Sequence, residues 1–294
     1  MDNKYINVEW WPELQRPVLI AGFSGWSDAA EAASVSISTL EESWGAQRFG
    51  NFDADEFLDY QSTRPEVKLV DGVTRVIEWP ENVLSVSSGV PATTGGRGAV
   101  FLSGPEPNFR WRSFCDSVVE LARELDVGMV VTMGALLADV PHSRPVAVSA
   151  SAQDPALVEK LGLSASRYEG PTGITGVLHR LCADADIPSV SFWASVPHYL
   201  PAVPSAPAAL ALLGNLSELL EVEVDTTQLE QTADDYQEQV AAAVSQDSDL
   251  ASYVNTLEER YDVHSQGEAT DLPSGDELAQ ELESFLRDER GEEE

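Results

Sequence analysis

Two histidines in this sequence each follow a Val-Pro dipeptide, in Val140-Pro141-His142 and Val196-Pro197-His198. Imidazole has an ordinary pKa near neutrality, so two histidines in one pocket could act as general acid and general base. Proline fixes its own φ and biases the preceding residue away from helix, so each histidine is expected on a rigid, extended loop. We therefore take His142 and His198 as the candidate catalytic residues.

Charged and aromatic side chains near these histidines could complete a catalytic pocket. Asp139 or Glu169 could orient one of the imidazoles, and Arg144 or Arg97 could hold an anionic substrate. Tyr199, which follows the second histidine, is a further candidate binding residue. This set defines a hypothetical small-molecule site of the hydrolase or phosphorylase kind.

Signatures of other chemistries are weak. The nucleophile-elbow pattern Gly-x-Ser-x-Gly is absent, because Gly22-Phe23-Ser24-Gly25 is one residue short of it. A metal site made from His142, His198 and Asp139 would match no named ligand spacing, so we expect neither a metal nor a cofactor. The alternative to a catalytic role is that the Pro-His loops cap strand ends, with their imidazoles bonded locally.

A second candidate site is the turn Gly170-Pro171-Thr172-Gly173. Thr172 is the expected N-cap of a helix that carries Ile174 and Leu178. Backbone N–H groups at a helix N-terminus attract anions, so Gly170, Thr172 and Gly173 are candidate binding residues. The alternative is a plain helix cap without a ligand.

The Pro-His loops follow two segments that read as buried strands. Residues 127–133 and 188–195 are short, apolar and rich in β-formers, which is typical of strands in a parallel sheet covered by helices. Ligands of such sheets bind beyond the carboxyl ends of the strands. If the two strands are parallel, both histidines lie at the same edge of the sheet.

The remaining elements alternate between strands and helices. Strands are expected at 18–23 and 99–103, with a helix after each, capped by Ser27 or Asp28 and by Asn108. Asp71-Gly72 between two β-rich runs predicts a hairpin. The Ala- and Leu-rich helix 206–220 is expected to be buried, either in the core or at a subunit contact. Three tryptophans are expected in the core, namely Trp26, Trp111 and Trp193.

The composition limits the class of protein. The net charge of −33 repels nucleic acid and anionic membrane surfaces, so we expect neither as a partner. No apolar run is long enough to cross a bilayer, and the first residues lack a signal-peptide pattern, so a cytoplasmic location is expected. Cys115 and Cys182 are expected to be buried thiols.

The charge is uneven, and it suggests three regions. Residues 1–220 carry −13 and residues 221–294 carry −20. We predict an α/β domain over 1–224, with a mostly parallel sheet flanked by helices. An acidic helical extension over 225–264 is expected to pack on that domain. Residues 265–294 are expected to form a partly disordered acidic tail with a short amphipathic helix at 276–287.

Several segments together resemble the bacterial branch of the proteasome assembly chaperone 2 family. They are Gly22-Phe23-Ser24-Gly25-Trp26-Ser27-Asp28-Ala29, Gly104-Pro105-Glu106-Pro107 with Arg110-Trp111, Gly134 to Pro145, Tyr168 to Ile174, and Trp193 to Tyr199. The resemblance covers about residues 15–245. It implies an α/β fold of the phosphorylase/hydrolase-like kind and, by analogy with eukaryotic and archaeal relatives, binding to proteasome subunits during assembly.

Two functional hypotheses follow. The first is a non-enzymatic protein-binding factor, chaperone-like, with protein partners that include proteasome subunits. The second is a small-molecule hydrolase or phosphorylase-like enzyme that uses the His142/His198 pocket. Self-association is expected under both, with a trimer as one plausible state, because the helix 206–220 could form a subunit contact and the family's members form oligomers.

Overall fold

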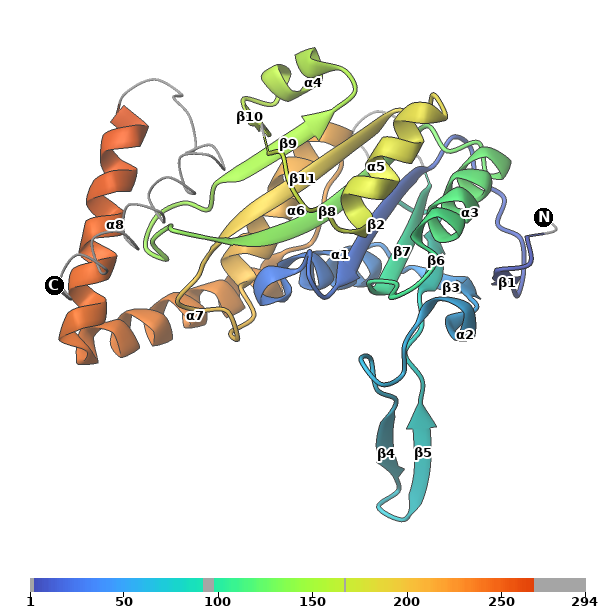
Figure 1. Ribbon diagram of the computed structural model, residues 1–294, viewed down its shortest axis with the longest axis horizontal. Helices are drawn as coiled ribbons and strands as arrows, with labels where there is room; N and C mark the ends of the chain where they lie inside the picture. The colour runs from blue at the N-terminus through green and yellow to red at the C-terminus, as the bar shows by residue number, and fades with distance from the viewer. Residues whose placement is uncertain (1–2, 92–97, 167, 267–294) are drawn as a thin grey trace, which may run out of the picture.

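The computed structural model describes residues 3–91, 98–166 and 168–266 of the chain (Figure 1). Arg97 and the tail from 267 onward, including the helix expected at 276–287, lie outside the described residues. A nine-stranded sheet forms the centre, with strand order β1-β3-β6-β7-β2-β8-β11-β9-β10. The strands of this sheet are β1 (Ile6–Val8), β2 (Val18–Ser24), β3 (Gln47–Phe52), β6 (Val83–Ser87), β7 (Ala99–Pro105), β8 (Met129–Ala138), β9 (Val148–Ala152), β10 (Ser164–Ala165) and β11 (Ser189–Pro197).

The sheet is mixed, so the expectation of a mostly parallel sheet is wrong outside its centre. β7, β2, β8 and β11 are parallel, as the buried apolar runs predict. β1, β3 and β6 pair antiparallel up to β7, and β9 is antiparallel to β11. These flanking strands mix serines and charged residues with apolar ones, so their sequences carry no direction signal.

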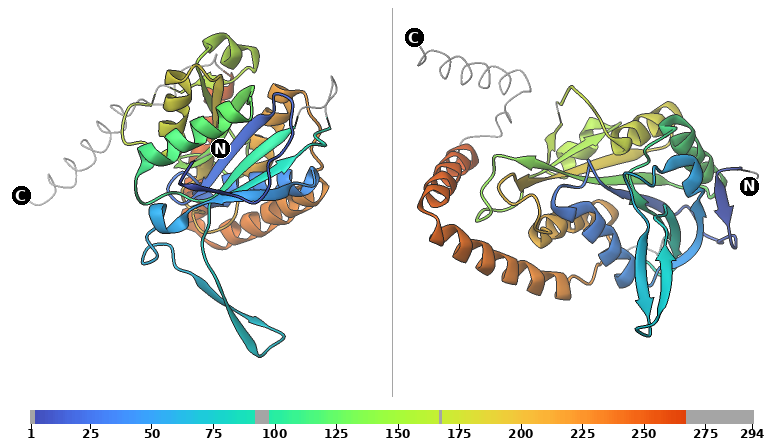
Figure 2. Two further views of the ribbon diagram at one scale, coloured as in Figure 1. Left: turned by 90° about the vertical axis from the view of Figure 1, so that its right-hand side faces the viewer. Right: turned by 60° about the horizontal axis from the view of Figure 1, so that its bottom comes forward.

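Helices cover both faces of the sheet (Figures 1 and 2). They are α1 (Ala32–Ser43), α2 (Ala54–Phe57), α3 (Trp111–Glu124), α4 (Pro155–Lys160), α5 (Ile174–Asp184), α6 (Ala206–Leu220), α7 (Thr227–Gln246) and α8 (Ser248–Gln266), with a 3-10 turn, η1, at Ala29–Glu31. α1 and α6 share one apolar core with the sheet, and α3 and α5 share the other. This two-faced burial explains the apolar runs of β2 and β8.

Helix α6 belongs to the core. Leu212, Leu213 and Leu216 are at most 1 % exposed, and α6 packs between α1, β11 and α7. Burial inside the domain therefore accounts for its Ala- and Leu-rich sequence. A subunit contact is not needed to explain this composition, and the expected self-association stays a prediction.

One of the two expected helix caps is confirmed and the other is wrong. The Asp28 carboxylate accepts the N–H groups of Ala33, at 2.7 Å, and Ser34, at the start of α1. Asn108 does not cap α3, because its Oδ1 accepts the backbone N–H of Asp59 instead. Among the three tryptophans expected in the core, Trp26 is 62 % exposed, which corrects its assignment.

The Asp71-Gly72 hairpin forms as predicted, from β4 (Glu66–Val70) and β5 (Thr74–Glu78). It is a separate two-stranded sheet that projects away from the nine-stranded sheet as a free ribbon (Figure 1). All ten of its strand residues are exposed. The sequence predicted the pairing but gave no sign that the pair would stand apart from the core.

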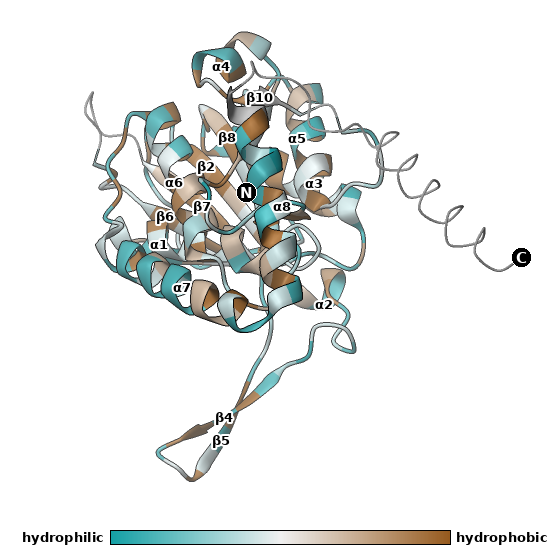
Figure 3. Cartoon of the chain, turned by 90° about the vertical axis from the view of Figure 1, so that its left-hand side faces the viewer, coloured by the Kyte–Doolittle hydropathy of each residue, from teal (hydrophilic) through white to brown (hydrophobic). Residues whose placement is uncertain are grey.

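The two last described helices form a bent arm, which we call the C-terminal arm (α7 and α8). α7 leaves α6 along the domain, and α8 turns back across the end of the sheet where β8 and β11 finish (Figures 2 and 3). Leu229 and Ala233 at the start of α7 join the main core, whereas Tyr236, Val240 and Val254 form a smaller cluster of their own. Within the described chain, no helix is both long enough and apolar enough to span a bilayer.

Candidate functional site

The two Pro-His loops lie together, as the parallel strands predict. β8 and β11 pair in parallel from Val130↔Ser189 to Ala138↔Pro197. Each strand is longer than expected at its carboxyl end, because this pairing continues to the residue before Asp139 and His198. His198 N–H donates to the Ala138 carbonyl at 3.1 Å, so the loops begin side by side.

His142 is buried and bonded to Tyr199. It is 8 % exposed, and the Tyr199 hydroxyl lies 2.9 Å from its backbone nitrogen and 2.8 Å from Nδ1. Burial lowers the pKa of the His142 imidazole, although nearby Glu258 opposes that shift. Burial also raises the pKa of Tyr199 to about 12. Both groups are therefore neutral at physiological pH.

His198 is held by a carboxylate, as one of the two expected arrangements requires. Its Nδ1 lies 3.1 Å from Asp139 Oδ1, and both side chains are well exposed. Tyr199 and Tyr253 pack edge-on against the His198 ring, with centroid distances of 5.7 and 5.6 Å. Glu169, the other expected orienting residue, is exposed on the loop before α5.

Arg144 binds the C-terminal arm. Its Nε and Nη2 donate to the two carboxylate oxygens of Asp262, each at 2.8 Å, and Nη1 lies 3.5 Å from Glu258. The Ser143 hydroxyl also donates to Glu258. A bidentate arginine–carboxylate pair combines charge with fixed geometry. The arginine expected to hold an anionic substrate therefore holds two carboxylates of α8.

The arm closes the space between the loops. The cavity that contains His142 has a volume of about 10 Å³, which is about enough for one water molecule. Its lining includes Tyr236 from α7 and Ser205 from the start of α6. The cavity that His142 lines is therefore too small for the substrate of a hydrolase or phosphorylase, and His198 is not among its lining residues.

The Gly170 to Gly173 turn makes contacts of its own, apart from the Pro-His loops. Thr172 is exposed and does not cap α5, contrary to expectation. Instead Glu106, from the loop after β7, accepts the Ile174 N–H at 2.7 Å through Oε1. The anion that this helix N-terminus attracts is thus a carboxylate of the same chain.

Gly173 is needed where these loops meet. It is buried, and a Cβ at this position would overlap the Ser27 hydroxyl and lie 2.9 Å from Glu106 Oε1. Ser27 and Thr175 beside it are at most 1 % exposed. The capping role of Glu106 was not predicted from the sequence, because Glu106 lies 68 residues before Ile174, whose N–H it accepts.

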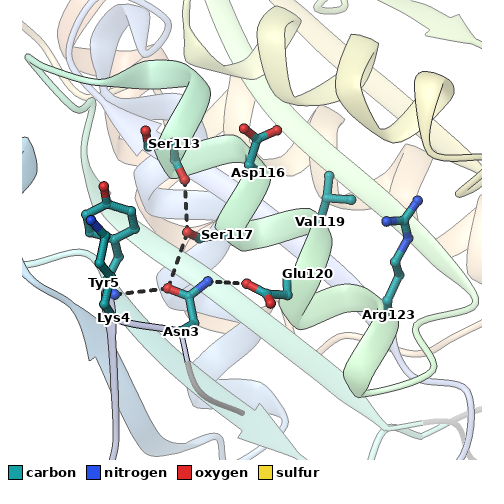
Figure 4. Close-up of a pocket in the computed structure, with 9 residues that line it drawn as sticks. All are labelled: Asn3, Lys4, Tyr5, Ser113, Asp116, Ser117, Val119, Glu120 and Arg123. Carbon is teal, nitrogen blue, oxygen red and sulfur yellow. Dashed lines mark hydrogen bonds between the residues drawn. The ribbon is translucent and has the colours of Figure 1, made fainter.

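An open groove on α3 is a further hollow in the surface (Figure 4). It has a volume of about 550 Å³ and lies between α3 and the N-terminal segment. Its lining includes Asn3, Lys4, Tyr5, Ser113, Asp116, Ser117, Val119, Glu120 and Arg123. Asn3 bonds to Glu120 and Ser117, and the lining has two positive and two negative side chains. The groove therefore favours neither sign of charge.

The projecting hairpin is the main exposed apolar feature of the described chain. Its exposed large apolar residues are Val67, Leu69, Val70, Val73, Val76, Ile77 and Trp79, with exposures from 43 to 83 %. Val67 pairs with Ile77, and Leu69 lies next to them on the same face. The segment 64–79 contains three basic and three acidic residues, so this ribbon is neutral on a protein of charge −33.

Comparison with known proteins assigns the family. The family model described as PAC2 family matches residues 22–244, and the chain therefore belongs to that family. The search of curated proteins found no match. No group of three or more His, Cys, Asp or Glu side chains among the described residues is arranged to hold a metal ion.

Solved structures agree with this assignment. A PAC2 family protein from Streptomyces avermitilis is 42% identical, with a TM-score of 0.74 over 81% of this chain and 99% of its own. A proteasome-assembly chaperone homologue from Mycobacterium tuberculosis has the same identity and coverage, with a TM-score of 0.73. PbaB of Pyrococcus furiosus, an archaeal proteasome activator, is 17% identical, with a TM-score of 0.66 over 83% of this chain and 99% of its own, and shares the fold.

Proposed function

We propose that this chain is a non-enzymatic protein-binding factor of the proteasome-assembly-chaperone kind, which acts in the cytoplasm on protein partners that include proteasome subunits. The observation that carries the proposal is the 42% identity to a proteasome-assembly chaperone homologue within the PAC2 family, and the apolar hairpin β4–β5 supplies a surface for protein contact. Apolar surface of this kind on a soluble domain is characteristic of protein-binding sites. The cavity beside His142, with a volume of about 10 Å³, gives no support to the alternative of a small-molecule enzyme.

The hairpin binds a second copy of this chain, and the protein is therefore a homo-oligomer, with a trimer as one plausible state. An isolated two-stranded hairpin is marginal in water, and an exposed apolar ribbon invites aggregation. A protein that covers the hairpin must therefore be present, at the same concentration, whenever this chain is made. Another copy of the chain always meets this condition. A neutral ribbon can also approach a second acidic molecule without the repulsion that the rest of the surface would create.

The remaining parts of the proposal concern architecture. Residues 1–224 form the α/β domain, which we assign to the phosphorylase/hydrolase-like architecture. Residues 225–264 form the acidic extension that packs on it, and residues 265–294 follow as the acidic tail. Partner proteins would bind the assembled oligomer, since its repeated copies raise the effective concentration of each weak contact.

Sedimentation of the full-length protein tests the self-association. Wild type is expected to sediment as an oligomer at micromolar concentration. The triple variant Val67→Ser, Leu69→Ser, Ile77→Ser, which changes one face of the hairpin, is expected to sediment as a folded monomer. A matched control, Lys68→Ser with Thr74→Ser on the other face, should remain oligomeric. A monomeric wild type would overturn this part of the proposal.

A separate experiment tests the partner. Full-length protein is mixed with purified 20S proteasome α and β subunits from the native host, and complexes are separated by size and identified by mass. Co-elution of named subunits with wild type supports the function. No complex with either type of subunit, from a protein shown to be correctly oligomeric, would contradict it.

A further inference from the structure

His142 joins both Pro-His loops to the C-terminal arm. Its backbone N–H donates to the Tyr199 hydroxyl at 2.9 Å, and its carbonyl accepts from Gln237 Nε2 of α7 at 2.8 Å. Its ring lines the 10 Å³ cavity together with Tyr236 of α7. A change at this residue therefore reaches the loop of β11 and the arm at the same time.

The contacts of His142 require an uncharged ring. The Tyr199 hydroxyl accepts the His142 backbone N–H, and its single proton is then available for Nδ1 at 2.8 Å. We assign Nδ1 as the acceptor of that proton, which is the arrangement that satisfies both groups with an uncharged ring. A proton added to Nδ1 would leave the Tyr199 hydroxyl without an acceptor and place a positive charge in an enclosed site.

Little around His142 could stabilise that charge. Tyr199 and Tyr236 are neutral, and the Tyr236 hydroxyl has no hydrogen-bond partner among the described residues. Glu258 of α8 is the acidic group that favours the charged ring, but desolvation outweighs it. The cavity has room for about one water, so the imidazolium would lose most of its hydration.

The other charged and titratable groups near the ring already have partners. Asp139 faces His198 and Arg144 faces Asp262, while Tyr253 packs on His198 and Tyr199. These pairs lie at the rim of the site and are considerably more exposed than His142. A positive charge on the buried His142 imidazole would therefore destabilise the site more than the charges of these paired groups.

The outer part of the arm can move without unfolding the domain. Leu229 and Ala233 anchor the start of α7 in the main core. From Tyr236 onward the arm rests on a small separate cluster and on the polar contacts of Arg144 and His142. Segments with few buried apolar contacts open with a lower free energy than the core.

We propose that His142 is a pH sensor, whose protonation releases the segment 236–266 from the Pro-His loops and uncovers the end of the sheet. The docked state binds the proton less tightly than the open state. Docking is therefore strongest above pH 6.5, the ordinary value for an exposed imidazole, and weakens as the pH falls below it. Each unit by which the pH falls in this window raises the equilibrium constant for opening of the arm by up to tenfold, because opening takes up one proton.

Hydrogen exchange of the full-length protein between pH 8 and 5 tests this inference. After correction for the intrinsic exchange rate, amides of α8 and of α7 from Tyr236 onward are expected to exchange faster below pH 6.5, by up to tenfold per unit. Amides of β2 and β8 should not change. His142→Gln, which stays neutral, should remove the pH response of the arm.

Two further variants separate this role from a merely structural one. His198→Gln changes the more exposed histidine and should keep the wild-type response. Tyr199→Phe removes the hydroxyl that favours neutral His142, so it should speed exchange of the arm at pH 8 and reduce the further increase when the pH falls. The inference is overturned if wild-type arm amides are unaffected by pH, or if His142→Gln keeps the response. Self-association and partner binding play no part in this readout.

Discussion

At the scale of single residues, several chemically capable side chains of this protein are engaged in holding the chain together. Arg144 binds carboxylates of α8, Glu106 caps α5, and Asp28 caps α1. Desolvation raises the pKa of the buried Asp28 carboxyl and, for the thiol of Cys182, raises it to about 12. A buried thiol of that kind is unreactive. Residue types alone therefore do not distinguish a catalytic side chain from one that holds the fold together.

The Glu106 cap predicts a loss of stability when its charge is removed. Glu106→Gln should reduce the free energy of unfolding by about 1 kcal/mol, because a charged acceptor at the α5 N-terminus is replaced by a neutral one. Denaturant midpoints measure the change. Thr172→Ala is the matched control, since Thr172 is exposed and caps nothing, and it should lie within about 0.5 kcal/mol of wild type.

Gly173 predicts a steric effect at the same junction. Gly173→Ala should destabilise the protein by about 1–3 kcal/mol, because its Cβ would overlap the Ser27 hydroxyl and crowd Glu106. Gly214→Ala is the control, since nothing lies within 4 Å of the added Cβ on α6. If both variants have the same denaturant midpoint, the loops that carry Ser27, Glu106 and Gly173 do not pack as closely as described here.

At the scale of elements, the C-terminal arm and the hairpin differ in how they are attached. The arm rests on the domain through an ion-pair set and a small apolar cluster. The hairpin makes its strand hydrogen bonds internally and exposes its side chains. The sequence predicts the arm and the hairpin as separate elements. It does not predict the surface that each one contacts, because that surface is distant in the sequence or belongs to another molecule.

The Arg144 contact predicts weaker docking of α8 when the arginine is removed. Arg144→Met keeps much of the apolar stem but loses the bidentate pair with Asp262. Amides of α8 should then exchange several-fold faster at pH 7.5, with core amides unchanged. Arg180→Met is the control, since Arg180 pairs only with Asp184 on the exposed surface of α5. Equal protection of α8 in both variants would show that the ion pairs do not hold the arm.

At the scale of the whole molecule, net charge opposes contact between copies. Each chain carries −33, so two copies repel one another at low ionic strength. In the self-association that we propose, the neutral hairpin would give them an apolar contact that salt does not weaken. Salt therefore acts in opposite directions on self-association and on docking of the arm. It screens the repulsion between copies, which favours self-association, and it screens the Arg144 ion pairs, which weakens docking.

We therefore expect added salt to strengthen self-association. Raising the ionic strength from about 0.05 to 0.5 M, which shortens the screening length severalfold, should lower the dissociation constant of the oligomer. Sedimentation at both salt concentrations measures it. A dissociation constant that rises with salt would indicate an interface held by opposite charges, which the hairpin cannot supply.

The sequence by itself determined the central parallel strands, the hairpin and the meeting of the two Pro-His loops. These features follow from local rules, namely apolar runs that require burial, turn residues that require particular φ values, and parallel strands that share one edge. The resemblance of short motifs also placed the chain in its family. The burial of α6 was readable from its Ala- and Leu-rich composition, but the exposed position of Trp26 was not, because residue type does not say which way a side chain on a turn faces.

Tertiary structure alone decided what the candidate site does. His142 is buried because α7 and α8 lie over it, and no property of residues 139–145 reveals that cover. Arg144 meets Asp262 across 118 positions of sequence, and Glu106 reaches Ile174 across 68. Such contacts depend on where the chain returns in space, so a local pattern can nominate charged side chains but cannot choose between a substrate and another part of the same chain.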